Sequence, residues 1–186
     1  MAFKFTDLSV PGVVLIEPQK FSDDRGFFIE RYKTSYFAVH GVSELFNQDN
    51  YSVSRRGVVR GMHYQLEPMA QGKLVGVITG SIFDVAVDIR RGSPYFGRWV
   101  GETLTGESCN MLWIPPGFAH GFMALEDQTR VTYKTTSEYS PKHDRGILWN
   151  DPDLGIVWPK DVAPILSGKD LEHPRLKDAE INFSYV

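Results

Sequence analysis

Short runs of apolar and β-branched residues, separated by turn residues, follow one another from Lys73 to Thr136. Glycine, proline and acidic residues mark the turns, and no helical period of apolar positions competes with the strand pattern. The pattern predicts strands at residues 73–79, 82–89, 96–104, 110–114, 121–125 and 129–136. Such a succession of short strands is typical of an antiparallel sandwich or barrel.

The first two of these strands are separated only by Gly80 and Ser81. A two-residue link with a glycine supplies the positive φ of a tight turn, so we expect residues 73–79 and 82–89 to form a hairpin. Alternate positions of 82–89 are all apolar, whereas the other face carries Asp84 and Asp88. This second face can meet water or line the lumen of a small barrel, and the motifs described below favour the lumen.

Outside this block, the pattern predicts strands at residues 13–18, 26–30 and 58–64 and a short helix at 34–39, ended by Gly41. Five prolines limit any helix in residues 140–186 to short pieces. A length of 186 residues, with 42% hydrophobic and 23% charged residues, fits one domain spanning residues 1–186. The aromatic content of 13% favours sheet over helix.

The charge and cysteine content exclude several classes of protein. A net charge of −3 without a basic cluster argues against a nucleic-acid-binding protein. The single Cys109 permits no internal disulfide, and the N-terminal residues lack the pattern of a signal peptide. No apolar run approaches the ~18 residues that cross a bilayer. We therefore expect a cytoplasmic protein without a membrane partner.

Two histidines lie in segments that suggest chemistry. His63 occupies a position within a predicted strand, where its imidazole can act as a base near neutral pH, although most strand histidines are structural. Residues 115–120 fit the Pro-x-Gly-x-x-His pattern of cupin-type jelly rolls. Metal-binding cupins supply a second histidine where this chain has Gln65. His63 and His120 alone are too few ligands, so we predict no metal and no organic cofactor.

The chain resembles the dTDP-4-dehydrorhamnose 3,5-epimerase family over nearly its whole length. The resemblance implies an all-β, cupin-like jelly-roll barrel with a few short helices. It rests on many motifs in the same order, among them residues 24–30, 48–50, 60–65, 71–75, 84–90, 113–122, 133–134, 147–152 and 166–170.

The resemblance implies roles for four residues in the epimerisation of dTDP-4-keto-6-deoxyglucose. His63 would remove the protons at C3 and C5, which the C4 ketone makes acidic. Lys73 would stabilise the negative charge that develops on the ketone oxygen. Asp170 would orient His63 and stabilise its imidazolium, and Tyr133 would return a proton to the opposite face.

The resemblance also implies a set of substrate-binding residues. Cationic side chains would bind the diphosphate, and amide and carboxylate groups would bind the sugar hydroxyls and the thymine. These residues are Arg25, Glu30, Gln48, Asp49, Asn50, Arg60, Lys73, His120, Asp144 and Lys169. Asp144 stands where relatives often have glutamate.

We therefore expect a cofactor-independent isomerase on the path to dTDP-L-rhamnose and cell-surface polysaccharide. The resemblance implies a homodimer, in which N-terminal strands could extend the partner's sheet. Three alternatives stay open. The chain could invert only C3 or only C5 in another deoxysugar pathway, it could be a metal-dependent cupin enzyme, or it could bind a sugar nucleotide without turnover.

Overall fold

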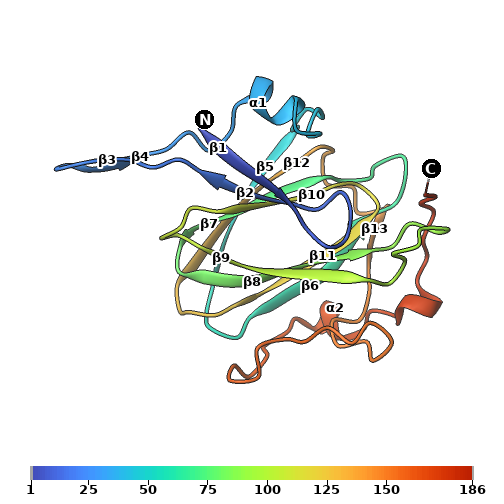
Figure 1. The fold of residues 1–186 in the computed structure, drawn as a ribbon. Coiled ribbons are helices and arrows are strands. Elements are labelled where there is room, and N and C mark those ends of the chain that lie inside the picture. Colours follow the sequence, from blue (N-terminus) through green and yellow to red (C-terminus); the bar gives the residue numbers. More distant parts are fainter. Residues whose placement is uncertain (1, 186) are drawn as a thin grey trace.

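The computed structural model describes residues 2–185 and shows two antiparallel β-sheets facing each other (Figure 1). The six-stranded sheet has the order β1-β2-β10-β7-β12-β5, and the five-stranded sheet has the order β13-β6-β11-β8-β9. The predicted jelly-roll fold is confirmed. The strands are β1 (Phe3–Asp7), β2 (Val14–Pro18), β3 (Phe21–Asp23), β4 (Gly26–Phe28), β5 (Gln48–Ser54), β6 (Val59–Gln65), β7 (Lys73–Thr79), β8 (Ser81–Asp88), β9 (Trp99–Thr105), β10 (Met111–Ile114), β11 (Phe118–Ala124), β12 (Thr129–Thr135) and β13 (Asp144–Gly146).

The predicted hairpin of residues 73–79 and 82–89 is wrong. Strand β7 pairs with β10 and β12, whereas β8 pairs with β9 and β11 in the other sheet. Gly80, with a φ of +80°, turns the chain tightly as expected, but the turn carries it from one sheet to the other. Both strands place apolar residues between the sheets, so their alternation fits a crossover as well as a hairpin.

Other differences concern strands with weak apolar patterns. The polar strand β5 and the short strands β1, β3 and β13 were not predicted, and β11 begins three residues before the predicted 121. The short helix is confirmed as α1 (Thr34–Ala38). The C-terminal region contains only the short α2 (Gly168–Leu171) and η1 (Leu176–Asp178), as its prolines predict.

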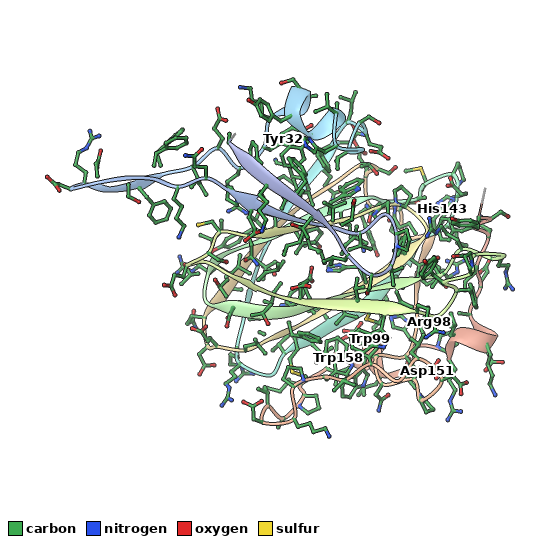
Figure 2. All side chains as sticks on the ribbon, in the orientation of Figure 1. Tyr32, Arg98, Trp99, His143, Asp151 and Trp158 are labelled. Atoms are coloured by element: carbon green, nitrogen blue, oxygen red, sulfur yellow. The ribbon has the colours of Figure 1, made fainter. Side chains whose placement is uncertain are left out.

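Three apolar layers hold the fold together. One lies between the sheets, where Val77 and Leu112 of one sheet pack with Ile82 and Leu104 of the other. A second lies between the five-stranded sheet and the C-terminal segment of residues 147–183, which runs beneath the sheet (Figure 1). Trp158 of this segment is part of this layer, and Trp99 of β9 packs against it (Figure 2). The third lies between the outer face of the six-stranded sheet and α1.

The alternation predicted for residues 82–89 is confirmed, and both faces of β8 are largely buried. Val85 and Val87 pack against the C-terminal segment, whereas Ile82 and Ala86 pack between the sheets. The side chain of Asp84 is fully buried on the lumen side. The carboxylate face therefore lines the interior of the barrel.

The ribbon of β3 and β4 extends away from the body of the molecule (Figure 1). Its strands pair only with each other among residues 2–185, and Phe21, Phe27 and Phe28 are about half exposed or more. Strand β2, one of the N-terminal strands expected to extend a partner's sheet, is in contrast paired on both sides, with β1 and β10. No helix within the described residues is long and apolar enough to cross a membrane.

Candidate active site

A cavity of about 710 Å³ opens between the two sheets. Its walls come from β5, β7 and β12 of the six-stranded sheet, from β6, β11 and β13 of the five-stranded sheet, and from residues 165–170. Ten residues predicted from the sequence line it: His63, Tyr133, Asp170, Lys73, Gln48, Asn50, Arg60, His120, Asp144 and Lys169. The fold therefore brings together residues that are far apart in the chain.

His63 and Asp170 form a hydrogen-bonded pair on one wall. His63 Nε2 lies 2.6 Å from Asp170 Oδ1, and Asp170 is almost fully buried. Burial alone would raise the pKa of Asp170, but hydrogen bonds from His63 and Ser167 and the charge of His63 outweigh it and lower the pKa. The ionised carboxylate can only accept a hydrogen bond, so Nε2 of His63 carries the proton. The lone pair of Nδ1 is then available as a base.

Local sequence places both members of this pair. Ser167 caps the short helix α2, and its Oγ accepts a hydrogen bond from the backbone N–H of Asp170. In β6, Gly61 has a φ of +134°, and a Cβ there would lie 2.4 Å from Cα of Gly121. Only glycine permits this close approach of β6 and β11, which sets His63 opposite His120 as its cross-strand partner.

Lys73 connects the two walls. It begins β7 in the six-stranded sheet, yet its Nζ donates a hydrogen bond of 3.1 Å to the carbonyl oxygen of His63 in the other sheet. Burial lowers the pKa of Lys73 to about 8, although Asp144 and Asp84 oppose the shift. The ammonium group therefore lies beside His63 in an environment with little water, where its charge acts strongly.

Tyr133 faces this pair from the opposite sheet. It belongs to β12, whereas His63 belongs to β6, and both line the same cavity. Burial raises the pKa of Tyr133, which Arg60 opposes only in part. The phenol therefore keeps its proton at neutral pH. The imidazole of His63 and the phenol of Tyr133 thus lie on two different walls of the cavity.

A second histidine and carboxylate pair lies deeper in the barrel. His120 Nε2 lies 2.7 Å from Oδ1 of Asp84, and both side chains are buried. Burial lowers the pKa of His120, and the attraction of Asp84 opposes this shift without reversing it. His120 therefore tends to remain neutral and to donate a hydrogen bond to Asp84.

Polar groups surround the mouth of the cavity. Lys169 Nζ forms an ion pair with Asp144, whose Oδ2 also accepts a hydrogen bond from the Tyr139 hydroxyl. Arg60 Nε donates a hydrogen bond of 3.2 Å to Ser54 Oγ. Gln48 and Asn50 share a hydrogen bond along β5. These groups can bind phosphate, hydroxyl and amide groups of a ligand.

Three predicted binding residues do not line this cavity. Arg25 lies on the projecting ribbon, where its side chain is 89% exposed and paired with Asp23. Glu30 follows the same ribbon. Asp49 points to the outer face of β5 and pairs with Lys134 at 2.9 Å, because successive side chains of a strand alternate between faces. A single chain does not bring these three residues to the cavity.

Sequence reasoning missed several residues in or next to the site: Tyr139 and Ser167 line the cavity, whereas Asp84 and His173 lie behind its walls. Asp84 was placed on the lumen face by its alternation but was not assigned to the site. Tyr139 and Ser167 lie in loops without a periodic pattern, and although residues 166–170 match a family motif, neither residue was assigned to the site. His173 was missed for the same reason. Together with His63 and Asp170 it forms the one group within residues 2–185 that offers three metal-ligand side chains at close range.

Comparisons with known proteins agree on one family. The family model described as dTDP-4-dehydrorhamnose 3,5-epimerase matches residues 7–178. A Pseudomonas aeruginosa protein of that name is 53% identical over 180 residues, which cover 95% of this chain and 98% of the relative. The crystal structure of a Legionella pneumophila 3,5-epimerase in complex with dTDP-4-keto-L-rhamnose has a TM-score of 0.95 and 42% identity, and covers 99% of both chains.

A more distant structure is that of an enzyme with a narrower activity. It is a 3'-monoepimerase from Streptomyces bikiniensis in complex with dTDP-quinovose, with a TM-score of 0.87 and 36% identity. The match covers 92% of this chain and 87% of the other. The barrel is therefore shared between enzymes that invert one carbon and enzymes that invert two.

Proposed function

The chain belongs to the dTDP-4-dehydrorhamnose 3,5-epimerase family, and from this premise we propose that His63, Lys73, Tyr133 and Asp170 carry out its reaction. The enzyme is an isomerase of dTDP-L-rhamnose biosynthesis. It converts dTDP-4-dehydro-6-deoxy-D-glucose to dTDP-4-dehydro-L-rhamnose.

In the proposed reaction, Nδ1 of His63 removes the proton from the carbon next to the C4 ketone. The electron pair of the broken C–H bond moves to the ketone oxygen, and the ammonium group of Lys73 stabilises the enolate. Asp170 stabilises the imidazolium of His63. The Tyr133 hydroxyl then delivers a proton to the other face of the planar carbon, which inverts it. His63 then releases its proton to solvent and the Tyr133 phenolate takes one up, so that the same cycle can act at C3 and at C5.

The observation that best supports these roles is the placement of the two proton-transfer groups. The base must lie on one side of the sugar ring and the acid on the other, because inversion exchanges the face that bears the proton. His63 and Tyr133 come from opposing sheets and line one cavity. Lys73 lies against the backbone of His63, on the base side.

Solvent isotope uptake tests the proposed function. Chelator-treated protein is incubated in heavy water with dTDP-4-keto-6-deoxyglucose, and NMR follows the product. We expect deuterium at both C3 and C5 together with the L-rhamno configuration. Uptake at one carbon only would identify a single-site epimerase, dependence on an added metal would identify a metal enzyme, and binding without uptake would identify a binding module.

Replacing Lys73 with glutamine is expected to lower kcat by about 100- to 1000-fold, the usual cost of losing one donor to a developing oxyanion. Affinity for dTDP should change much less, because the charge is needed only when the enolate forms. Steady-state kinetics and dTDP titration measure the two effects. The control is Lys134→Gln, since Lys134 pairs with Asp49 on the outer face. Equal losses in both variants would contradict the role of Lys73.

We also propose that two chains form a homodimer in which the ribbon of one chain completes the cavity of the other. Two features support this arrangement. The ribbon projects with exposed phenylalanines, and β5, beside the cavity, pairs only with β12 among the described residues. A partner's ribbon could extend the sheet at β5 and bring Arg25 and Glu30 to the substrate. This arrangement would explain how Arg25 and Glu30 bind substrate although they do not line the cavity of their own chain.

Mixing two variants with impaired activity tests this dimer. Arg25→Ala leaves the cavity intact, and His63→Ala leaves the ribbon intact. Refolding the two together should restore roughly one quarter of the wild-type activity below KM, because half of randomly paired dimers are mixed and each has one complete site. Each variant alone should stay weakly active. Mixed dimers without recovery would show that Arg25 does not act across the interface.

Two further expectations remain proposals. We propose that residues 1–186 work as a single domain, which is supported by the C-terminal segment packing on the barrel and supplying Asp170 to its cavity. We also propose a cytoplasmic location, which is supported by the free thiol of Cys109.

A further inference from the structure

Three side chains that commonly bind transition metals gather behind the proposed base. The donor atoms of His63, Asp170 and His173 lie within 4.8 Å of one another. Asp170 Oδ1 lies 2.6 Å from Nε2 of His63 and 3.6 Å from Nε2 of His173. His173 follows α2, three residues after Asp170. Two imidazoles therefore converge on one carboxylate.

His173 has no role in the proposed reaction, yet it is held firmly. Its side chain is nine-tenths buried, and its Nε2 is buried without a hydrogen-bond partner. Its ring packs against Gly146, where a Cβ would lie 2.3 Å from Nε2. Gly146 is the cross-strand partner of His63. The ring is therefore fixed beside the base, with an unpaired nitrogen close to Asp170.

We propose that His63, Asp170 and His173 form an inhibitory binding site for Zn²⁺ or a similar divalent transition ion. Zinc binds imidazole nitrogen at about 2.0–2.1 Å and carboxylate oxygen at about 2.0–2.2 Å, in a tetrahedral arrangement. A small separation of His63 from Asp170 would admit the ion, and the cavity, into which His63 is 32% exposed, gives access to a water as fourth ligand.

The donor set determines which ions fit. Two imidazoles and one carboxylate suit Zn²⁺, Co²⁺ or Ni²⁺, whereas Mg²⁺ prefers oxygen ligands. Lys73 and Lys169 are cationic neighbours that oppose a divalent ion, and Asp144 partly balances them. We therefore expect binding that depends on all three ligands.

Inhibition follows from the chemistry of the imidazole, and this step rests on the proposed function. The metal takes the lone pair of Nε2 of His63, so the one ring proton moves to Nδ1. Nδ1 then carries a proton and has no lone pair to accept one from the sugar. The ion also occupies the carboxylate that would stabilise the imidazolium. No oxidation or net proton release is required. The bound ion therefore blocks the base directly.

The test compares chelator-treated wild type with His173→Gln. Competition with a chromophoric chelator measures the affinity for Zn²⁺. The visible spectrum of bound Co²⁺ reports which side chains bind the metal. The rate of deuterium uptake in metal buffers measures inhibition. We expect wild type to bind one Zn²⁺ and lose activity in parallel. His173→Gln should keep its basal rate and bind at least about tenfold more weakly, since losing even a ligand's outer partner costs roughly 10- to 100-fold.

The control variant is His143→Gln. His143 lies on the loop before β13, where its Nδ1 is bonded to Ser140 Oγ (Figure 2). This variant should bind zinc as wild type does, and Mg²⁺ should inhibit none of the proteins. His173→Asn serves as a second variant if His173→Gln folds poorly.

Two results would overturn the proposal: no zinc binding by wild type, or equal binding and inhibition in wild type and the His173 variants. Failure of the proposed function is distinguishable, because it would appear as absent deuterium uptake in chelator-treated wild type, whatever the metal affinity.

Discussion

Replacing His63 with alanine is expected to lower deuterium uptake at both C3 and C5 by about 100- to 10,000-fold, the usual contribution of a positioned general base. The two carbons should lose exchange together, because one imidazole serves both. Binding of dTDP should persist, since Arg60 and Lys169 at the cavity mouth are unchanged. NMR in heavy water measures exchange at each carbon, and titration with dTDP measures binding.

The variant Asp170→Asn provides a graded comparison with His63→Ala. Asp170→Asn leaves the imidazole in place but removes the charge that stabilises its protonated form, so its exchange rate should fall less than that of His63→Ala. His143→Ala should exchange as wild type does. Full exchange at either carbon in His63→Ala would show that another group removes that proton.

Replacing Tyr133 with phenylalanine is expected to separate exchange from inversion. Without the hydroxyl, His63 can still remove a proton, exchange it with solvent and return deuterium to the same face. Formation of the L-rhamno product should fall by about 100- to 10,000-fold, while deuterium uptake with retained configuration falls much less. The size of the difference reports how fully the phenol supplies the second proton.

One NMR time course measures both quantities, because the labelled substrate and the inverted product have distinct ring-proton signals. Tyr139→Phe is a suitable control, since Tyr139 also lines the cavity but bonds to Asp144 at its mouth. If uptake and inversion fell equally in Tyr133→Phe, the hydroxyl would be acting on deprotonation or on binding instead. An unchanged rate of inversion would require a different acid.

The sequence predicted the strands whose apolar pattern is strong, but not their partners. Residues 73–79 were placed correctly as β7, and Asp84 was placed correctly on the lumen face. The hairpin with β8 was wrong because a tight glycine turn and alternating burial fit both a hairpin and a crossover between sheets. Alternation determines which face is buried, whereas pairing depends on the whole barrel.

The sequence likewise predicted site residues within strands better than site residues in loops. His63, Lys73 and Tyr133 lie within strands that matched family motifs, and all three line the cavity. His173 and Tyr139 lie in loops whose positions are set by packing against the barrel, which no local pattern encodes. Arg25 and Glu30 matched a motif but do not line the cavity of their own chain, and a motif does not specify where the fold places its residues.

Asp170 reaches His63 across 107 positions of the chain, on a segment that packs beneath the completed barrel. A nascent polypeptide could therefore form both sheets and still lack the carboxylate that is hydrogen-bonded to His63. Catalytic competence would arise in a late step of folding, when the C-terminal residues dock. Transient release of that segment in the mature enzyme would likewise stop turnover without melting the β-structure, so activity should be lost at milder denaturant than the circular dichroism of the sheets.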